Sequence, residues 1–290
     1  MGKRRTTSLR ATGRNRTKAQ GAGVLRIGAV AYHPKVVTIW EGFRVYFENR
    51  GVKIDYVLYS NYETQVDAML NNIIDLAWNS PLAWVRSQML SRGGCCALAM
   101  RDTDRDLTTL VLVRRNSGVV SLKDLKGKTI AVGASDSPQA TLIPLAMLAD
   151  AGIEPGQDCG VVYNNVMVGK HGDHIGGERD AARALADGRV DAACVLDGNF
   201  STFVNDGTLD SGTTAVVAKT APYDHCNFTA LAKVSDARRR IFVDCLLGMS
   251  FDDPSVRELM EMEGLKRWLP GRTSGYSQLE HAVERFHFYA

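Results

Sequence analysis

Short apolar runs alternate with amphipathic stretches through the first part of the sequence. Residues 24–30, 53–59 and 73–78 have the length and apolar character of strands. Between these runs, residues 36–49 and 62–72 place apolar side chains at the spacing of one helix face. The order strand, helix, strand, helix, strand predicts a parallel sheet covered by helices.

The same alternation starts again after residue 113. The predicted elements are strands at 129–133, 160–168 and 190–196 and helices at 121–126, 138–151, 179–187, 235–247 and 253–268. Gly152 and Gly188 directly follow two of these helices, at the position where helices commonly end. An apolar strand from residue 215 precedes the last two helices.

This order of elements predicts an α/β protein of two lobes. We assign residues 24–114 and 215–290 to the first lobe, and residues 115–214 to a second lobe inserted between two crossings of the chain. At 290 residues the chain is long enough for each lobe to bury its own core. Residues 1–23 are assigned to a disordered basic tail.

The composition is that of a globular protein, with 45% hydrophobic and 23% charged residues. No window approaches the roughly 18 to 20 apolar residues of a transmembrane helix. Of the 35 Lys and Arg residues, seven lie in residues 1–23, which contain no acid. The rest of the chain therefore carries 28 bases against 32 acids, a balance that gives no indication of nucleic-acid binding.

The N-terminal segment has the basic start of an export signal but lacks the apolar stretch that must follow it. The Arg4-Arg5 pair is compatible with a twin-arginine signal, which needs the same stretch. The six cysteines lie mostly inside apolar runs, a pattern typical of reduced, buried thiols. We therefore expect a cytoplasmic protein, or a periplasmic one only if the N-terminus is processed unusually.

Three segments resemble the phosphate/phosphite/phosphonate-binding family of ABC-transporter solute-binding proteins. Residues 75–85 (DLAWNSPLAWV) resemble the strand and turn at the hinge side of the ligand cleft. Residues 121–133 (SLKDLKGKTIAVG) resemble the entry to the second lobe, and residues 262–282 (MEGLKRWLPGRTSGYSQLEHA) the C-terminal helix and tail. The resemblance implies a type 2 periplasmic-binding-protein-like fold with a two-segment hinge and an interlobe cleft.

The function implied by the resemblance is that of a solute-binding or sensing protein. Its ligand would be a small anion, such as a phosphonate, a sulfonate or a carboxylate, and its partner an ABC transporter or a sensor. We expect a monomer or a weak dimer. The alternative is a cytoplasmic enzyme acting on a small organic molecule in the same cleft, because some proteins with this fold have become enzymes. No catalytic triad, carboxylate pair or metal motif is recognisable, so binding is favoured.

The turn after the predicted strand 129–133 is the first candidate ligand contact. Ser137 and Pro138 suit the cap and the first position of the next helix, whose free N–H groups can bind an oxyanion. The alternative is that these residues only cap the helix. Because the family uses this turn for its anion, the resemblance implies ligand contacts from Ser135, Ser137, Gln139 and Thr141.

This turn departs from the Ser-Thr-Ser-Gly sequence that the family typically has. Here the four residues are Ser137, Pro138, Gln139 and Ala140, and Asp136 adds a negative charge beside them. A fully ionised phosphate would be repelled unless that carboxylate accepts a proton from the ligand. The turn therefore favours a monoanion or a zwitterion.

Further candidates come from both lobes, and a structural role is the alternative for each. Loops at the carboxyl ends of strands face the crevice of an α/β protein. On this ground, and on the resemblance, the other candidate ligand contacts are Tyr32, His33, Tyr62, Asn79, Ser80, His174, Arg179, Asp197 and Tyr223. Arg179 stands where the family usually has a histidine, and its planar guanidinium suits an oxyanion.

Two groups of residues have metal-binding or reactive side chains. His171, Asp173, His174 and Glu178 are metal-ligand types, but their spacing matches no zinc signature, so we expect a solvated loop. The adjacent Cys95 and Cys96 lie in an apolar run that predicts a strand, where their side chains point to opposite faces. We expect a structural role for them, and neither a metal nor a cofactor.

Overall fold

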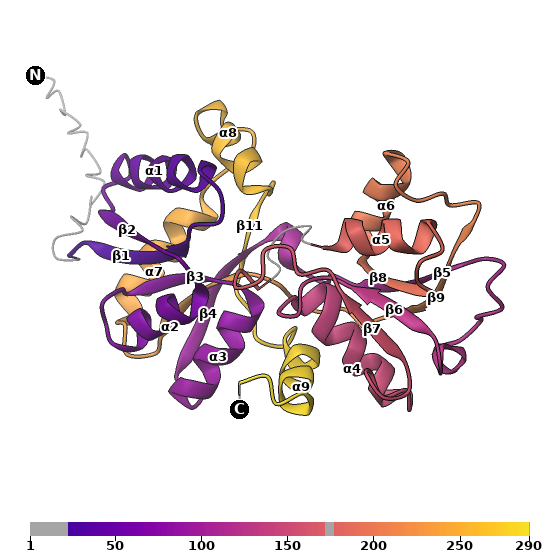
Figure 1. The fold of residues 1–290 in the computed structure, drawn as a ribbon. Helices are drawn as coiled ribbons and strands as arrows, with labels where there is room; N and C mark the ends of the chain where they lie inside the picture. Colours follow the sequence, from indigo (N-terminus) through magenta and orange to yellow (C-terminus); the bar gives the residue numbers. More distant parts are fainter. Residues whose placement is uncertain (1–22, 172–176, 290) are drawn as a thin grey trace, which may run out of the picture.

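The computed structural model describes residues 23–171 and 177–289, which form two α/β lobes lying side by side (Figure 1). Among these residues, the sheet of the first lobe has six strands and that of the second has five. The α/β architecture with two lobes, predicted from the alternation of strands and helices, is confirmed.

The first-lobe sheet combines parallel and antiparallel strands. In spatial order they are β11 (Trp268–Pro270), β4 (Cys95–Arg101), β10 (Asn227–Leu231), β3 (Leu76–Asn79), β1 (Leu25–Val30) and β2 (Ile54–Tyr59). Strand β1 pairs in parallel with β2 and β3, as predicted, whereas β10 is antiparallel to β3 and β4. The helices of this lobe are α1 (Lys35–Glu48), α2 (Tyr62–Leu70), α3 (Pro81–Ser91), α7 (Asp236–Leu247), α8 (Pro254–Glu263) and α9 (Ser277–Arg285).

The second-lobe sheet has the order β7 (Gly160–Tyr163), β6 (Thr129–Val132), β8 (Ala192–Leu196), β5 (Thr109–Arg114) and β9 (Thr214–Lys219). Its helices are η2 (Leu122–Leu125), η3 (Pro138–Leu142), α4 (Ile143–Asp150), α5 (Glu178–Ala186) and α6 (Asp197–Asn205). The predicted helix 138–151 consists of the π-helical turn η3, which continues directly into α4. In the described ranges, none of the helices combines the length and the apolar character that a bilayer crossing requires.

The strand pairing moves the predicted lobe boundaries. Boundaries at residues 114 and 215 assign β5 and most of β9 to the first lobe, but both strands pair within the second sheet. The reason is long-range pairing: β5 is buried from Leu110 to Val113 and lies between β8 and β9, and a local pattern does not reveal which sheet such a strand joins. The chain therefore crosses between the lobes near residues 102–108 and 220–226.

The two crossings run beside each other and are tied together. Leu107 and Tyr223 exchange backbone hydrogen bonds of 2.8 and 2.9 Å. From the segment after β11, Arg272 donates to both carboxylate oxygens of Asp224 and to Asp106, at 2.6 Å in each case. Because Asp106 and Asp224 belong to different crossings, Arg272 fastens both of them to the first lobe.

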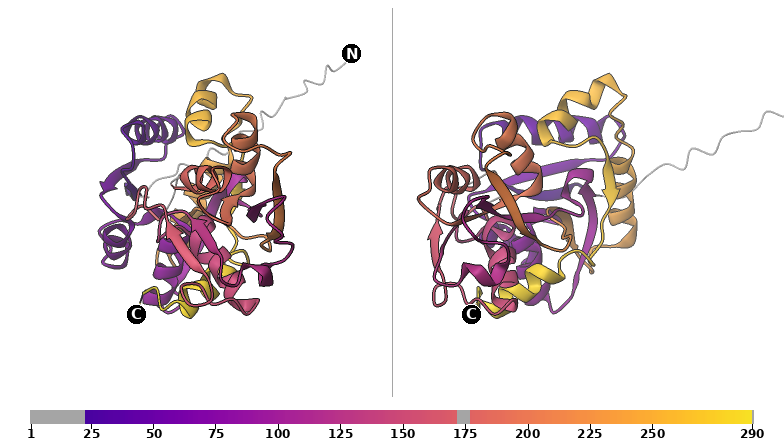
Figure 2. Two further views of the ribbon diagram at one scale, coloured as in Figure 1. Left: turned by 45° about the vertical axis from the view of Figure 1, so that its right-hand side comes forward. Right: turned by 90° about the vertical axis from the view of Figure 1, so that its right-hand side faces the viewer.

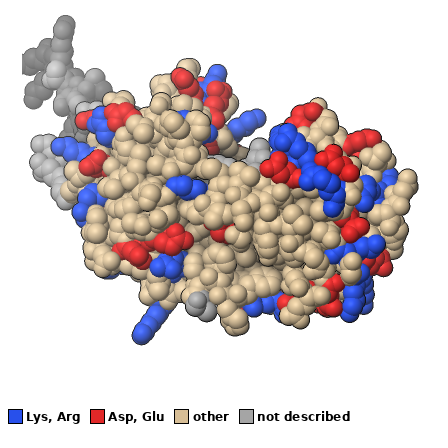
Figure 3. All heavy atoms as spheres, viewed as in Figure 1, with Lys and Arg blue, Asp and Glu red and all other residues tan. Residues whose placement is uncertain are grey.

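The lobes are in direct contact along one edge of their junction. Ile143 and Ala146 of the second lobe share a buried apolar cluster with Trp84 and Leu279 of the first. Helix α9 packs against α4 there, at the opposite edge of the molecule from α8 in every view (Figures 1 and 2). Near α8, the space-filling view shows a notch in the outline between the two lobes (Figure 3).

Candidate functional site

The turn between β6 and η3 forms the second-lobe side of the candidate site. The hydroxyl of Ser137 accepts a hydrogen bond from the backbone N–H of Ala140 at 3.2 Å, so Ser137 is the predicted N-cap. Gly133 allows the turn to pack closely, because a Cβ at this position would lie 2.7 Å from the Cβ of Ala140. The turn thus presents the N-terminus of the continuous η3–α4 helix, with the partial positive charge that attracts anions.

Other predicted contacts of this turn differ in exposure. Ser135 is exposed, and its backbone N–H donates to Asn165 Oδ1 at 3.0 Å. Thr141 is buried, and its hydroxyl has no hydrogen-bond partner within the described part of the chain. Gln139 is also buried and lies toward the hinge.

Asp136 is directed at a backbone segment of its own lobe. Its Oδ2 atom accepts hydrogen bonds from the N–H groups of Gly169 (2.7 Å) and His171 (3.0 Å). Its Oδ1 atom is buried without a partner among the described residues. Asp136 therefore anchors residues 169–171, and one of its oxygens remains able to accept a further proton or hydrogen bond.

The first-lobe side of the site is built around the side chain of His171. The ring of Tyr62 stacks on the imidazole, with centroids 4.8 Å apart and an interplanar angle of 18°. Ser80 Oγ lies 2.6 Å from His171 Nδ1, and Glu63 Oε1 lies 3.0 Å from Nε2. The hydrogen bond with His171 lowers the pKa of Glu63. The structure thus brings the predicted residues Tyr62 and Ser80 together, against a residue of the other lobe.

Lys170 makes a second contact between the lobes. Its ammonium group donates to the carbonyl oxygens of Ala31, at 3.1 Å, and Ser60. These carbonyls follow β1 and β2, so Lys170 occupies the carboxyl-end edge of the first sheet, where ligands of open α/β sheets bind. Burial lowers the pKa of Lys170. Sequence reasoning did not select Glu63 or Lys170, and it considered His171 only as a metal ligand.

The other three first-lobe candidates differ in their surroundings, and one of them, Tyr32, lines a small cavity together with Tyr62. Asn79 is buried in an internal network, donating to Thr229 Oγ1 at 2.9 Å and accepting from Gln65 Nε2 at 2.8 Å. Tyr32 is half-buried against the first-lobe core. His33 is exposed, and its Nδ1 atom accepts from a neighbouring backbone N–H.

Arg179 and Asp197 are paired with residues of the second lobe or its border. The guanidinium of Arg179 donates to Asp206 Oδ2 at 2.6 Å and to Thr208 Oγ1 at 2.8 Å, and it lies over a phenylalanine ring. Asp197 accepts from Lys219 Nζ at 2.6 Å. The structure does not bring these two side chains to Tyr62 and Ser80, and His174 lies outside the described residues.

The remaining candidates, Tyr223 and Gln139, lie beside the two crossings between the lobes. The hydroxyl groups of Tyr223 and Thr109 lie 2.6 Å apart, and Thr109 also donates to the backbone oxygen of Gln139 at 2.6 Å. The side chain of Gln139 lies 3.4 Å from His225 Nε2. Burial raises the pKa of Tyr223, so this hydroxyl stays protonated. Tyr223 and Gln139 are thus joined through buried contacts beside the crossings.

Glu178, at the start of α5, is buried in the second lobe. Its Oε2 atom accepts from the backbone N–H of Leu196 and from Asn199 Nδ2, both at 2.9 Å. Burial raises the pKa of Glu178 to about 7, although hydrogen bonds, including one from Gln139, oppose the shift. His171 and Glu178 belong to separate networks, and both are buried, so the expectation of a solvated loop is wrong for these two residues.

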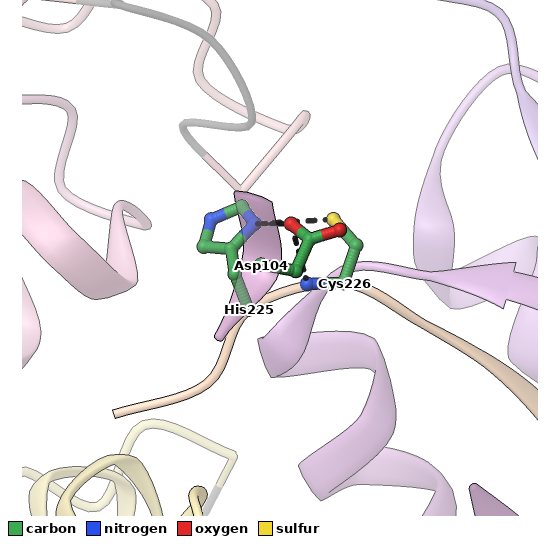
Figure 4. A group of neighbouring side chains, drawn as sticks. All are labelled: Asp104, His225 and Cys226. Carbon is green, nitrogen blue, oxygen red and sulfur yellow. Dashed lines mark hydrogen bonds and ion pairs between the residues drawn. The ribbon is translucent and has the colours of Figure 1, made fainter. Parts of the chain in front are cut away.

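Metal-ligand types do meet at the hinge, where Asp104, His225 and Cys226 lie together (Figure 4). His225 Nδ1 lies 3.2 Å from Cys226 Sγ and 3.4 Å from Asp104 Oδ1. Arg101 already donates to both oxygens of Asp104, at 2.6 and 3.0 Å. Burial would raise the pKa of Asp104, but the charge of Arg101 and hydrogen bonds with His225 and Arg101 lower it to about 2. A cation would meet the Arg101 charge, so we assign this cluster to the hinge structure.

Comparisons with known proteins agree with this architecture. Residues 28–276 match the family described as "ABC transporter, phosphonate, periplasmic substrate-binding protein". A probable ABC transporter phosphite binding protein, PhnD1 from Prochlorococcus marinus (strain MIT 9301), is 21% identical over 240 residues. The matched region covers 79% of this chain and 77% of PhnD1.

Solved structures share the fold at low sequence identity. PhnD1 from Prochlorococcus marinus (MIT 9301) in complex with methylphosphonate has a TM-score of 0.65 and 17% identity, over 91% of this chain and 98% of that one. XAC2383 from Xanthomonas citri bound to ATP has a TM-score of 0.71 and 16% identity, over 93% and 100% of the two chains. The aliphatic sulphonate binding protein SsuA from Escherichia coli has a TM-score of 0.56 and 17% identity, over 93% and 88%. The type 2 periplasmic-binding-protein fold is confirmed.

The family also corrects one prediction. The missing apolar stretch in the N-terminal segment predicts a cytoplasmic protein, and this is wrong, because the matched family consists of periplasmic substrate-binding proteins. The predicted solute-binding role is confirmed by the same match. Since the family model spans most of the sequence, the chain belongs to the phosphonate family of periplasmic substrate-binding proteins of ABC transporters.

Proposed function

We propose that this protein binds a small oxyanion of the phosphonate type between its lobes and delivers it to an ABC transporter. The proposal rests on one observation, the contact between residues 169–171 of the second lobe and the first-lobe residues Tyr62 and Ser80. Asp136, beside the cap of η3, holds residues 169–171, and His171 contacts Tyr62 and Ser80 of the first lobe. The helix N-terminus and the two first-lobe residues therefore belong to facing surfaces, as a ligand held from both lobes requires.

The chemistry of the turn favours a ligand that retains a proton or carries a positive group. The η3 N-terminus supplies backbone N–H groups for oxyanion oxygens, while Asp136 places a carboxylate beside them. A dianion would be repelled by this carboxylate, whereas a hydrogenphosphonate or a zwitterion can donate to its Oδ1 atom, which has no partner among the described residues. Sulfonates and carboxylates, which lack such a proton, should bind more weakly unless another group of the molecule donates.

We infer binding without chemical conversion. The matched family consists of substrate-binding proteins. In the described ranges, the cluster of His, Cys and acid side chains at the hinge is held by Arg101 and by backbone groups. The protein is proposed to act as a monomer or a weak dimer.

Calorimetric titration tests the ligand class directly. The purified protein is titrated with methylphosphonate, phosphite, 2-aminoethylphosphonate, phosphate, methanesulfonate and acetate, and mass spectrometry of denatured protein identifies any ligand that co-purifies. We expect the tightest binding from a phosphorus oxyanion that carries a proton or an ammonium group. Binding of none of these anions would contradict the proposal, and recovery of a chemically altered ligand would contradict binding without conversion.

Ser137→Ala should weaken binding of the preferred oxyanion by at least about tenfold. The substitution removes a hydroxyl at the η3 N-terminus, and hydrogen bonds to charged groups contribute about 1.5–3 kcal/mol. Titration calorimetry measures the change. Ser121→Ala is the matched control, since Ser121 caps η2 elsewhere in the same lobe. Equal affinity of the Ser137 variant and the wild type would place the anion elsewhere.

A further inference from the structure

Residues Gly169–His171, here called the strap, connect the two lobes. On the second-lobe side the strap is held through its backbone, because the N–H groups of Gly169 and His171 both donate to Asp136 Oδ2. On the first-lobe side it is held through its side chains. His171 is 1% exposed, although it lies in a turn outside any helix or strand. Such burial requires that the strap fits closely against the opposite lobe.

The strap covers the first-lobe surface that a ligand needs. The imidazole of His171 lies flat on Tyr62 and within 2.6 Å of Ser80 Oγ. Lys170 is bonded to the carbonyl oxygens of Ala31 and Ser60, at the ends of neighbouring strands. A ligand anion that binds the Ser80 hydroxyl would have to approach an atom that His171 already contacts. The strap and such a ligand would therefore compete for this hydroxyl.

The partners of His171 hold the strap on the first lobe. Its ring nitrogens have two partners, Ser80 at 2.6 Å and Glu63 at 3.0 Å, and its ring has an aromatic face. Glu63, at the start of α2, is half exposed, and it supplies a negative charge opposite the strap. The strap thus presents the hydrogen-bonding imidazole of His171, with the ammonium group of Lys170 beside it, to a carboxylate, a hydroxyl and backbone carbonyls of the first lobe.

We propose that the strap is a built-in competitor of the ligand: it holds the two lobes together through Tyr62 and Ser80, and it is displaced from them when the solute binds. This inference rests on the proposed ligand site. The proposal has a quantitative consequence. If only a fraction of the molecules has the strap released, the apparent dissociation constant for the solute equals the intrinsic constant divided by that fraction. Removing the strap side chains should therefore strengthen binding.

The test combines small-angle X-ray scattering with calorimetry, using wild type, His171→Ala and the double variant Lys170→Ala/His171→Ala. Without ligand, both variants should have a larger radius of gyration than wild type, because the lobes lose the contact that the strap makes with the first lobe and can separate about the two crossings. Methylphosphonate should bind the double variant at least about tenfold more tightly, equivalent to about 1.4 kcal/mol. His287→Asn is the control, since His287 is exposed and its φ of 50° is tolerated by asparagine.

The possible outcomes distinguish a failure of the strap proposal from a failure of the proposed function. An unchanged radius of gyration in both variants would overturn the strap as a closing device. Weaker binding by the variants would make His171 a ligand-binding group and would equally overturn the competition. If no anion binds to wild type or to the variants, the proposed function fails, while the scattering comparison still decides whether the strap closes the lobes.

Discussion

Replacing Arg272 with alanine should lower the free energy of unfolding by about 3–5 kcal/mol. Arg272 makes three hydrogen bonds of 2.6 Å, two to Asp224 and one to Asp106. Asp224 is 1% exposed, so removal of the guanidinium leaves a buried carboxylate without its counter-charge. Because the two aspartates lie on different crossings, the variant should also loosen the hinge.

Chemical denaturation followed by circular dichroism measures this effect. Arg189→Ala is the matched control, because Arg189 makes an exposed ion pair with Asp187, of a kind that contributes little to stability. The control should stay within about 0.5 kcal/mol of wild type. A loss of similar size in both variants would show that Arg272 makes no special contribution to the hinge.

Glu178→Gln should remove a contribution to the pH dependence of stability around neutrality. The pKa of Glu178 is raised from 4.5 to about 7 in the folded protein by burial. Between these values the folded state binds more protons than the unfolded chain, so wild-type stability contributed by this group is present below pH 4.5 and is lost as the pH rises through 7. The full loss amounts to about 3 kcal/mol. Glutamine stays neutral and keeps an oxygen for the N–H of Leu196.

Unfolding free energies of wild type and Glu178→Gln, measured from pH 4 to pH 8.5, test this expectation. The variant should be no more stable than wild type at pH 4 and should gain on it by about 3 kcal/mol toward pH 8.5. The comparison at pH 4 serves as the internal control for any loss of packing. Parallel curves over the whole range would show that Glu178 does not titrate in the folded protein as described.

The fold was largely predictable because periodicity reports which face of each element is buried. The alternation over residues 24–78 predicts the parallel pairing of β1 with β2 and β3, which the structure shows. The lobe boundaries at 114 and 215 were wrong, because strand pairing depends on residues far away in the sequence. Strand β5 pairs with β8 and β9 across separations of about eighty to one hundred residues, which no local window samples.

The C-terminal segment 262–282 has a structural role in this protein. A Cβ at Gly271 would lie 2.4 Å from the backbone of Ala97, and one at Gly275 would lie 2.1 Å from Asp224. These two glycines therefore let the segment approach the first-lobe sheet and the second crossing, where Arg272 forms its ion pairs. This segment therefore fastens both crossings to the first lobe.

The site was less predictable than the fold. Tyr62 and Ser80 are brought together, since both lie at helix starts that follow strands of one sheet. Arg179 was selected for its charge, but its guanidinium is satisfied by Asp206 and Thr208, and residue type alone does not distinguish among possible polar partners. The role of His171 depends on how the two lobes face each other, and single-sequence patterns carry no such information.

A crystal structure of the protein with its tightest-binding oxyanion tests the central claim most directly. The account predicts an anion between the lobes, hydrogen-bonded to backbone N–H groups at the start of η3 and to Tyr62 or Ser80, with the ring of His171 moved off Tyr62. An anion bound within one lobe, or bound with His171 still stacked on Tyr62, would contradict it.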